Sequence, residues 1–413
     1  MGWFQGIAGF LVALLLLSSD PEAEAASFWG LGDRTWANGV SADGSVVVGY
    51  SNDKNTLNLQ AFRWTEATGV ELLGDLPGGE LHSWANAASG DGSVIVGAGT
   101  NASNKQEAFR WTDATGMQGL GDLPNGQFLS EAHDVSSDGS IIVGNSQGSN
   151  GLEAFRWTDA AGMVGLGDLP GGSTWSSAQG ISADGSVIVG ASISSGVSGY
   201  EAFRWTDATG MQGLGDLPGG NFQSWANAVS ADGSTIVGYG TNADDTWEAF
   251  RWTDAIGMVG LGDLPGGITS STALDVSGDG SAIVGWSTTD RFHWGSWSFI
   301  HEAFIWDANH GMRSLQDVLV QDYGLGSALN GWFLLEATGI SDDGLTIVGR
   351  GINTNKPVVD VTARDAWVVR LDPPAPHPVP EPNTMLLFGI GLVMLIGSRW
   401  IQSIFTAAQR GNE

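Results

Sequence analysis

The chain has 413 residues and no cysteine, which excludes disulfide frameworks, thiolate metal sites and thiol catalysis. Its formal net charge of −29 repels phosphate groups and argues against a nucleic-acid partner. Hydrophobic residues make up 42% of the sequence and 63 residues are glycine, a composition that allows a large core interrupted by many turns.

The chain begins with a segment that has the features of an export signal. Residues 7–17 form an apolar run broken only by Gly9, and Ala23-Glu24-Ala25 then supplies the small residues that a signal peptidase reads. The run is too short for an ordinary membrane span. We therefore predict a helical signal peptide over residues 1–25, removed by signal peptidase, and export across the inner membrane. A buried N-terminal helix is the alternative.

Seven repeats follow. An Asp-Gly pair recurs at intervals of 46 to 48 residues, with a last interval of 64, and each pair precedes an apolar run that ends in glycine. The motif Ala-Phe-Arg-Trp recurs in step with it and degrades in the last two repeats. Such a period indicates an architecture in which each repeat is one supersecondary unit. The Asp-Gly pairs begin at Asp43, Asp91, Asp138, Asp184, Asp232, Asp279 and Asp343.

A single unit predicts four short strands. In residues 224–267, turn residues separate segments 226–230, 234–239, 247–253 and 258–263, each with β-branched or aromatic residues. We name these strands a, b, c and d. No helical periodicity lies between them, and four strands in about 47 residues are typical of a propeller blade.

The two ends of the repeat region are complementary. Residues 28–33 match a d strand that has no preceding c strand, and residues 366–371 match a c strand that lacks its d. The N-terminal strand can therefore complete the seventh blade and close a ring, which removes exposed sheet edges. We predict an all-β, seven-bladed β-propeller of four-stranded blades over residues 26–371. A β-solenoid or an open array is the alternative.

Motifs present in every repeat are expected to be structural. The Asp-Gly pair suits a tight a–b turn with a positive φ, and it lacks the further oxygen ligands that Ca²⁺ needs. No helix follows the Gly-Leu-Gly-Asp-Leu-Pro segments, so they are not phosphate-binding loops. We expect no metal site and no cofactor. The strand-c arginines are expected to pair with aspartates of neighbouring repeats: Arg63, Arg110, Arg156, Arg204 and Arg251.

Function is expected where the repeats differ. The b–c and d–a loops share one face of a propeller, and here they are longer and more variable than the a–b and c–d turns. Tryptophan beside Asn, Asp and His is typical of a carbohydrate-binding surface. The alternative is that these tryptophans pack between blades. The candidate ligand-binding residues are Trp36, Trp84, Trp225, Trp247, His293, Trp294 and Trp297.

No catalytic constellation stands out. The carboxylates outside the repeat register have no spacing that selects an acid–base pair, and no nucleophile elbow is present. We therefore predict that the protein is not an enzyme. A carbohydrate-active lyase or hydrolase on the same scaffold is the alternative, with these carboxylates as candidates: Glu80, Glu131, Asp290, Asp322 and Glu336.

The C-terminal region has three parts. A proline-rich linker is predicted over residues 372–383, and a hydrophobic helix with a polar tail over residues 384–413. The motif Val379-Pro380-Glu381-Pro382, the apolar run and a following Arg399 resemble the PEP-CTERM sorting signal of Gram-negative bacteria. The resemblance implies processing by an exosortase and transient anchoring in the inner membrane. A plain single-pass anchor is the alternative.

The repeats resemble the HAF family of bacterial extracellular repeats. The family's His-Ala-Phe stands here as Glu-Ala-Phe or Gln-Ala-Phe, for example at Ala108 and Ala154. The resemblance implies export and transfers no catalytic residue. We predict a protein of the cell surface or extracellular matrix that binds exopolysaccharide or another matrix component. A purely structural coat protein remains an alternative.

Overall fold

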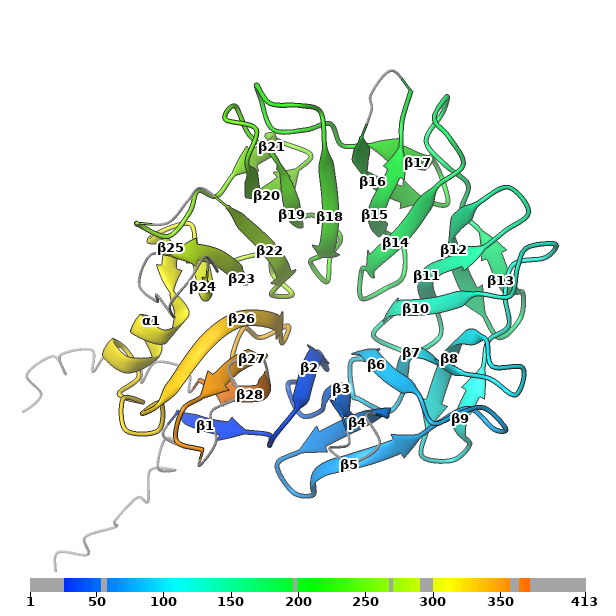
Figure 1. Cartoon of the computed structure of the whole chain (residues 1–413). Helices are drawn as coiled ribbons and strands as arrows, with labels where there is room; N and C mark the ends of the chain where they lie inside the picture. Colours follow the sequence, from blue (N-terminus) through cyan, green and yellow to red (C-terminus); the bar gives the residue numbers. More distant parts are fainter. Residues whose placement is uncertain are drawn as a thin grey trace, which may run out of the picture. The chain divides into compact units, whose positions relative to one another are not determined.

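The computed structural model describes residues 26–52, 58–195, 199–266, 270–289, 300–356 and 364–371. The described residues form 28 strands and one helix. The strands make seven four-stranded antiparallel sheets arranged as the blades of a ring (Figure 1). The predicted seven-bladed propeller is therefore confirmed. The predicted signal helix and C-terminal hydrophobic helix lie outside the described residues.

In each blade, strand a lies nearest the axis and strand d lies at the outside (Figure 1). Blade 1 contains β2 (Thr35–Val40), β3 (Val47–Asn52), β4 (Leu59–Thr65) and β5 (Gly69–Gly74). Blade 2 contains β6 (Ser83–Ala88), β7 (Ile95–Thr100), β8 (Gln106–Thr112) and β9 (Gly116–Gly119). Blade 3 contains β10 (Ser130–Val135), β11 (Ile142–Gln147), β12 (Leu152–Thr158) and β13 (Gly162–Gly165). Blade 4 contains β14 (Ser176–Ile181), β15 (Ile188–Ile193), β16 (Tyr200–Thr206) and β17 (Gly210–Gly213). Blade 5 contains β18 (Ser224–Val229), β19 (Ile236–Thr241), β20 (Trp247–Thr253) and β21 (Gly257–Gly260). Blade 6 contains β22 (Ser271–Val276), β23 (Ala282–Thr289), β24 (Ile300–Asp307) and β25 (Gly311–Ser314). Blade 7 contains β26 (Trp332–Ile340), β27 (Thr346–Asn353), β28 (Asp365–Arg370) and β1 (Ser27–Gly30), and α1 (Leu315–Gln321) lies between blades 6 and 7 in the chain.

The core lies between the faces of neighbouring blades. Strand b is buried on both faces, which explains its Ile-Val or Val-Val pair: Ile95 and Val96 of β7 are both 0% exposed. Phe109 of β8 is also 0% exposed and joins Val48 of blade 1 in one apolar cluster. Full burial of such a side chain contributes roughly 1.5–3 kcal/mol. The repeated apolar residues therefore stabilise each contact between blades.

A glycine in strand b has a steric reason. Strand a carries a β-bulge, seen in blade 1 as a register shift between Ala37 and Gly39. A Cβ added at Gly49 of β3 would lie 1.8 Å from the backbone oxygen of Trp36. Only glycine fits such an approach of two backbones. The same approach recurs in every blade, at Gly49, Gly97, Gly144, Gly190, Gly238, Gly285 and Gly349.

The Asp-Gly turns have the predicted conformation and join the blades. Gly44 has a φ of 71°, and Asp43 Oδ1 accepts the N–H of Ser45 at 2.9 Å. The turns are also linked across blades: the N–H of Gly90 donates to Ser137 O at 2.9 Å. Equivalent backbone bonds connect each turn to the next around the ring, from residues 43, 90, 137, 183, 231, 278 and 342 to residues 90, 137, 183, 231, 278, 342 and 42.

The N-terminal strand closes the ring as predicted. β1 pairs antiparallel with β28, with Ser27 opposite Arg370. Phe28 packs edge-on against Trp332 at 5.2 Å and stacks with Trp367 at 6.4 Å between ring centroids. Blade 7 therefore combines three strands from one end of the repeat region with one strand from the other.

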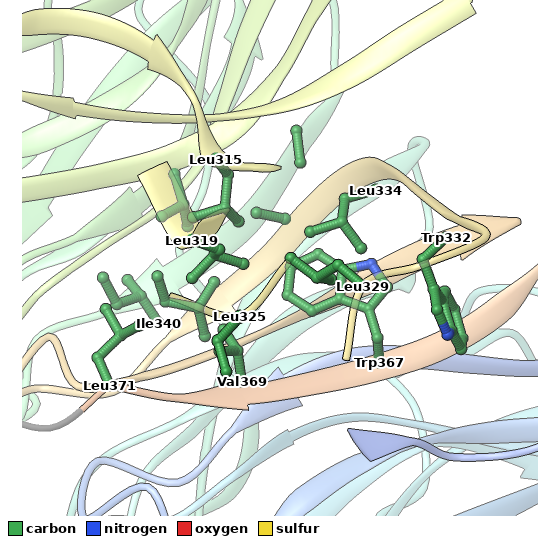
Figure 2. Packing of buried hydrophobic residues seen from close by; sticks show 14 residues of the cluster. Leu315, Leu319, Leu325, Leu329, Trp332, Leu334, Ile340, Trp367, Val369 and Leu371 are labelled. Atoms are coloured by element: carbon green, nitrogen blue, oxygen red, sulfur yellow. The ribbon is translucent and has the colours of Figure 1, made fainter. Parts of the chain in front are cut away.

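The helix α1 is an element that the sequence did not predict. Ser314 caps it, because its side chain accepts the N–H of Asp317. Leu315 and Leu319 from α1 enter the apolar cluster that holds Trp332 and Trp367 (Figure 2). The helix thus fills the space between blades 6 and 7.

In the described part of the chain, the predicted pairing of a strand-c arginine with an aspartate of a neighbouring repeat is seen for Arg63 alone. This side chain pairs with Glu71 at 2.8 Å and with Asp113 of the next blade at 3.0 Å. In four other blades the buried arginine Nε has no hydrogen-bond partner among the described residues: Arg110, Arg156, Arg204 and Arg251. The residue opposite explains the difference at Nε, because Glu71 faces Arg63 in the register whereas Val164 faces Arg156.

Candidate functional site

The antiparallel order gives the ring two different faces. We call the face formed by the b–c and d–a loops the loop face, and the opposite one, formed by the a–b and c–d turns, the turn face. On the loop-face side, three positions in each blade change from repeat to repeat: the second residue of strand a, the residue after the strand-b glycine, and the residue two before the strand-c alanine. In blade 5 these are Trp225, Tyr239 and Trp247, whereas blade 4 has Ser177, Ala191 and Tyr200.

Five aromatic rings from blades 4 and 5 form what we call the aromatic cluster: Trp175, Tyr200, Trp225, Tyr239 and Trp247. Trp175 lies 5.4 Å and Tyr200 5.0 Å from Trp225, both edge-on. Tyr239 is parallel to Trp225 at 6.4 Å and touches Trp247 edge-on at 5.1 Å. Trp247 is 38% exposed and the other four rings are half-buried. Burial, and next the nearby Tyr200, raise the pKa of Tyr239, so its hydroxyl stays protonated at neutral pH.

The other two tryptophans at the second position of strand a belong to separate groups. Trp36 stacks on Tyr50 with ring centroids 5.0 Å apart and an angle of 10°. Trp84 donates its indole N–H to Glu131 of the next blade at 2.8 Å. Gln106 donates to the other oxygen of Glu131 at 3.0 Å. Trp84 is therefore held between blades by a hydrogen bond, as the packing alternative expects for a structural tryptophan.

A charged group lies across blades 6 and 7. Trp286 stacks on His301 with 3.9 Å between ring centroids. His301 Nδ1 lies 3.9 Å from one oxygen of Glu336, and Arg350 Nη1 lies 3.5 Å from the other. Burial pushes the pKa of Glu336 upward, but hydrogen bonding to His301 and the charge of Arg350 outweigh it and lower the pKa. Glu336 is therefore ionised at neutral pH, and His301 is 38% exposed beside it.

The axis itself contains an acidic cavity of about 120 Å³, lined by strand-a ends and turns and including Asp134, Asp275 and Asp342. Asp134 accepts the N–H of Val135 at 2.8 Å and that of Ile181, in the next blade, at 2.9 Å. Asp275 makes the equivalent bonds in blades 6 and 7. Desolvation exceeds the effect of these bonds and raises the pKa of Asp134 and of Asp275 to about 7. The other five blades have glycine or alanine at this position: Gly39, Ala87, Gly180, Ala228 and Gly339.

The structure places the sequence-predicted ligand residues in different surroundings. It brings together Trp225 and Trp247, while Trp36 and Trp84 lie in other blades. Three of these four, Trp36, Trp225 and Trp247, each pack beside a tyrosine that the sequence prediction missed. The candidates His293, Trp294 and Trp297 lie outside the described residues. The missed residues are Tyr50, Tyr200 and Tyr239, and their signal was that three of the chain's 4 tyrosines stand at the variable loop-face positions.

Two kinds of feature are not found in the described residues. These residues contain no group of three His, Asp or Glu side chains suited to a metal ion. Within the same described ranges, no helix is both long enough and apolar enough to cross a membrane.

Comparison with solved structures shows the fold. Oligogalacturonate lyase from Vibrio parahaemolyticus is 10% identical, with a TM-score of 0.52, over 84% of this chain and 97% of that one. The β-propeller domain of the Trilobed protease from Pyrococcus furiosus is 12% identical, with a TM-score of 0.47, over 87% and 99%. TolB from Acinetobacter baumannii is 11% identical, with a TM-score of 0.44; the match covers 66% of this chain and spans 63% of TolB. At 10% identity, the likeness to oligogalacturonate lyase concerns the fold alone.

Comparison of the sequence identifies the sorting signal. No curated protein matches the chain. Residues 378–399 match the model of the PEP-CTERM protein-sorting motif, which contains the predicted Val379-Pro380-Glu381-Pro382. The motif implies export, membrane-anchored sorting and processing by an exosortase. The chain is thus a seven-bladed β-propeller that carries a PEP-CTERM sorting motif.

Proposed function

We propose that the loop face binds a polysaccharide and that the protein is a binding module of the cell surface or extracellular matrix. The observation that carries this proposal is the aromatic cluster of blades 4 and 5, with Trp247 exposed at its edge. Sugar rings present apolar C–H faces that stack on indole and phenol rings, while polar neighbours accept their hydroxyl groups. The sorting motif supports an extracellular ligand of this kind. The resemblance of the repeats to the extracellular HAF family, an expectation from the sequence, agrees with it.

The register of the repeats argues that these aromatic rings are not required for folding. Blade 4 has Ser177 where blade 5 has Trp225, and Ala191 where blade 5 has Tyr239. Both blades keep the same four-stranded sheet. The apolar area at the loop face is extended by Phe222, which is 36% exposed in the preceding d–a loop. An aromatic surface that the scaffold does not need is better explained by a ligand.

The test replaces two rings by the residues that blade 4 uses. The double variant Trp225→Ser with Tyr239→Ala is measured against a panel of bacterial exopolysaccharides, by calorimetry on the detergent-purified protein. We expect saturable binding to one polymer by the natural protein and a loss of roughly tenfold or more in the variant, since each lost stacking contact contributes about 0.5–1.5 kcal/mol.

The matched control is the same double change in blade 1, Trp36→Ser with Tyr50→Ala, which also removes a stacked pair but lies outside the aromatic cluster. This control should keep the affinity of the natural protein. Equal losses in both variants, or a fall in melting temperature confined to the blade 5 variant, would instead assign the cluster to packing.

A carbohydrate-active enzyme is the second candidate, and the arrangement of His301, Glu336 and Arg350 favours it. The ionised Glu336 can orient the imidazole, whose other nitrogen is then available as a general base. Glu336→Gln should abolish any release of new reducing ends or unsaturated products from the polymer that binds. Absence of such products across the whole panel with the natural protein would reject this candidate.

A further inference from the structure

In the described part of the chain, the carboxylates around the aromatic cluster accept hydrogen bonds from neutral donors. Asp216 Oδ2 accepts the N–H of Gln223, two residues before Trp225, at 2.7 Å. Asp245 Oδ1 accepts the N–H of Asn221 at 2.7 Å, and Asp245 lies two residues before Trp247. Backbone amides are neutral donors, so these hydrogen bonds bring no positive charge to either carboxylate.

The same is true of the next carboxylates along the loop face. Glu248, adjacent to Trp247, accepts from the side-chain amide of Asn242 at 3.0 Å and from a backbone N–H. Asp244 is exposed in the loop that leads to Trp247. These carboxylates belong to the same loop and strand as the exposed Trp247, so a cationic ligand held at the ring face is also attracted to them.

Cationic residues of these blades lie elsewhere. Over residues 176–260, which contain blades 4 and 5, the sequence has only two basic residues, Arg204 and Arg251, and no histidine. The guanidinium of Arg251 donates to Thr235 at the start of strand b, near the turn face. Arg204 occupies the equivalent position of the repeat. Among the described residues of blades 4 and 5, the charged side chains on the loop face around the aromatic cluster are therefore acidic.

From this juxtaposition we infer that the polysaccharide bound at the aromatic cluster carries free amino groups, as a polymer with deacetylated amino sugars does. The inference rests on the proposed function and adds the charge class of its ligand. Protonated amines are attracted by the carboxylates and by the ring faces. The carboxylates of a uronic acid polymer are repelled by the same groups and by the net charge of −29.

The test compares three oligosaccharides of equal length against the full chain: oligomers of glucosamine, oligomers of N-acetylglucosamine and oligogalacturonate. We expect the amine form to bind at least several-fold more tightly than the acetylated form at low salt, with that preference falling as salt screens the charges. Oligogalacturonate should not bind. Equal affinity for the amine and acetylated forms, or preference for oligogalacturonate, would overturn the inference while leaving glycan binding intact. Failure of all three, together with failure of the exopolysaccharide panel, would reject glycan binding itself.

A charge variant separates electrostatics from stacking. Asp244→Lys reverses an exposed charge in the loop before Trp247 and should weaken binding of the amine form by roughly threefold while leaving the acetylated form unchanged. Asp207→Lys is the matched control, because it makes the same change in an exposed c–d turn on the turn face. Equal effects of the two substitutions would contradict a local role for the loop-face charge.

Discussion

At the scale of single residues, the backbone N–H of the leucine in the d–a loop has two alternative hydrogen-bond acceptors, an aspartate or a serine. Before blade 5, Asp216 Oδ1 accepts the N–H of the following leucine at 2.8 Å. Before blade 4, Ser192 Oγ accepts the equivalent N–H at 3.1 Å, and Asp168 Oδ1 is left buried without a hydrogen-bond partner. Blade 5 has Gly240 in place of the serine, and a Cβ there would lie 2.7 Å from Asp216 Oδ1. The serine and the bonded aspartate therefore exclude each other.

The unpaired arginines lead to a stability prediction. Arg63 Nε is paired with Glu71, whereas the buried Nε of Arg156 faces Val164, which is 51% exposed. Val164→Glu places a carboxylate where blade 1 has Glu71. We expect the free energy of unfolding to rise by about 0.5 kcal/mol at low salt, because a cross-strand ion pair contributes roughly 0.2–1 kcal/mol. Urea unfolding measures it.

Val164→Gln is the control for this substitution, since it changes the shape in the same way without the charge. It should give less than half of the gain and no dependence on salt. A gain from Gln equal to that from Glu would show that replacing an exposed valine, and not pairing Arg156, accounts for the effect.

The axial aspartates predict a pH dependence of stability. The pKa of about 7 for Asp134 and Asp275 lies above the ordinary value of 3.8, so the native state binds more protons than the unfolded state between these values. Their contribution to the free energy of unfolding is therefore fully present below about pH 4 and is lost as the pH rises to about 7. In the double variant Asp134→Ala with Asp275→Ala, urea unfolding from pH 4 to pH 8 should lack this decline.

A turn aspartate provides the control of opposite sign. Hydrogen bonds from the backbone and side chain of Ser140, and then from Ser136, lower the pKa of Asp138. The contribution of Asp138 to the free energy of unfolding is therefore present above about pH 4 and is lost as the pH falls below 3.8, the ordinary pKa of the carboxyl group. Asp138→Asn should therefore alter the unfolding free energy above about pH 4, lose that effect on acidification, and leave the decline between pH 4 and pH 7 in place. Parallel pH profiles for the natural protein and the alanine double variant would refute the assignment of that decline to the axial pair.

At the scale of elements, the stability of α1 depends on its N-cap residue, Ser314. Ser314 Oγ accepts the N–H of Asp317 at 3.2 Å and donates to the buried Glu302. Ser314→Ala removes both bonds, and we expect the free energy of unfolding to fall by about 1–2 kcal/mol. Ser314→Thr keeps the hydroxyl and should lose less than half as much. Thermal unfolding of the two variants distinguishes them, and equal losses would show that the cap does not hold the helix.

At the scale of the whole ring, stability depends on the strand that closes it. Phe28 of β1 packs against Trp332 and Trp367, which come from the far end of the repeat region. We predict that Phe28→Ala lowers the free energy of unfolding by about 3 kcal/mol. Hydrogen exchange should then accelerate first in β27 and β28, because blade 7 loses its outer strand.

Leu72→Ala is the comparison for this change, since Leu72 is 56% exposed on β5, the outer strand of blade 1. It should leave both stability and the exchange of blade 7 unchanged. Uniform acceleration across all seven blades in Phe28→Ala would mean that the ring opens as one unit and not at the closure.

How much could be predicted from sequence differs between the fold and the site. The number and order of strands were predictable because every repeat contains its own turns, and the strand-c range 247–253 agrees with β20. Strand d ends earlier than predicted, at Gly260, because Gly262 has a φ of 76° and turns the chain. The helix α1 was missed because 7 residues inside an insertion carry too little periodicity.

What the sequence by itself determined is the repeated blade, the closing strand and the sorting motif, since local turns, strand patterning and a linear signal do not depend on distant contacts. The tertiary structure decided which side chains meet. Tyr200 reaches Trp225 from the neighbouring blade. Asp134 likewise accepts a hydrogen bond from the backbone N–H of Ile181 in the next blade. These contacts exist only because blades pack face to face, and residues about 25 to 47 positions apart become neighbours when the ring closes.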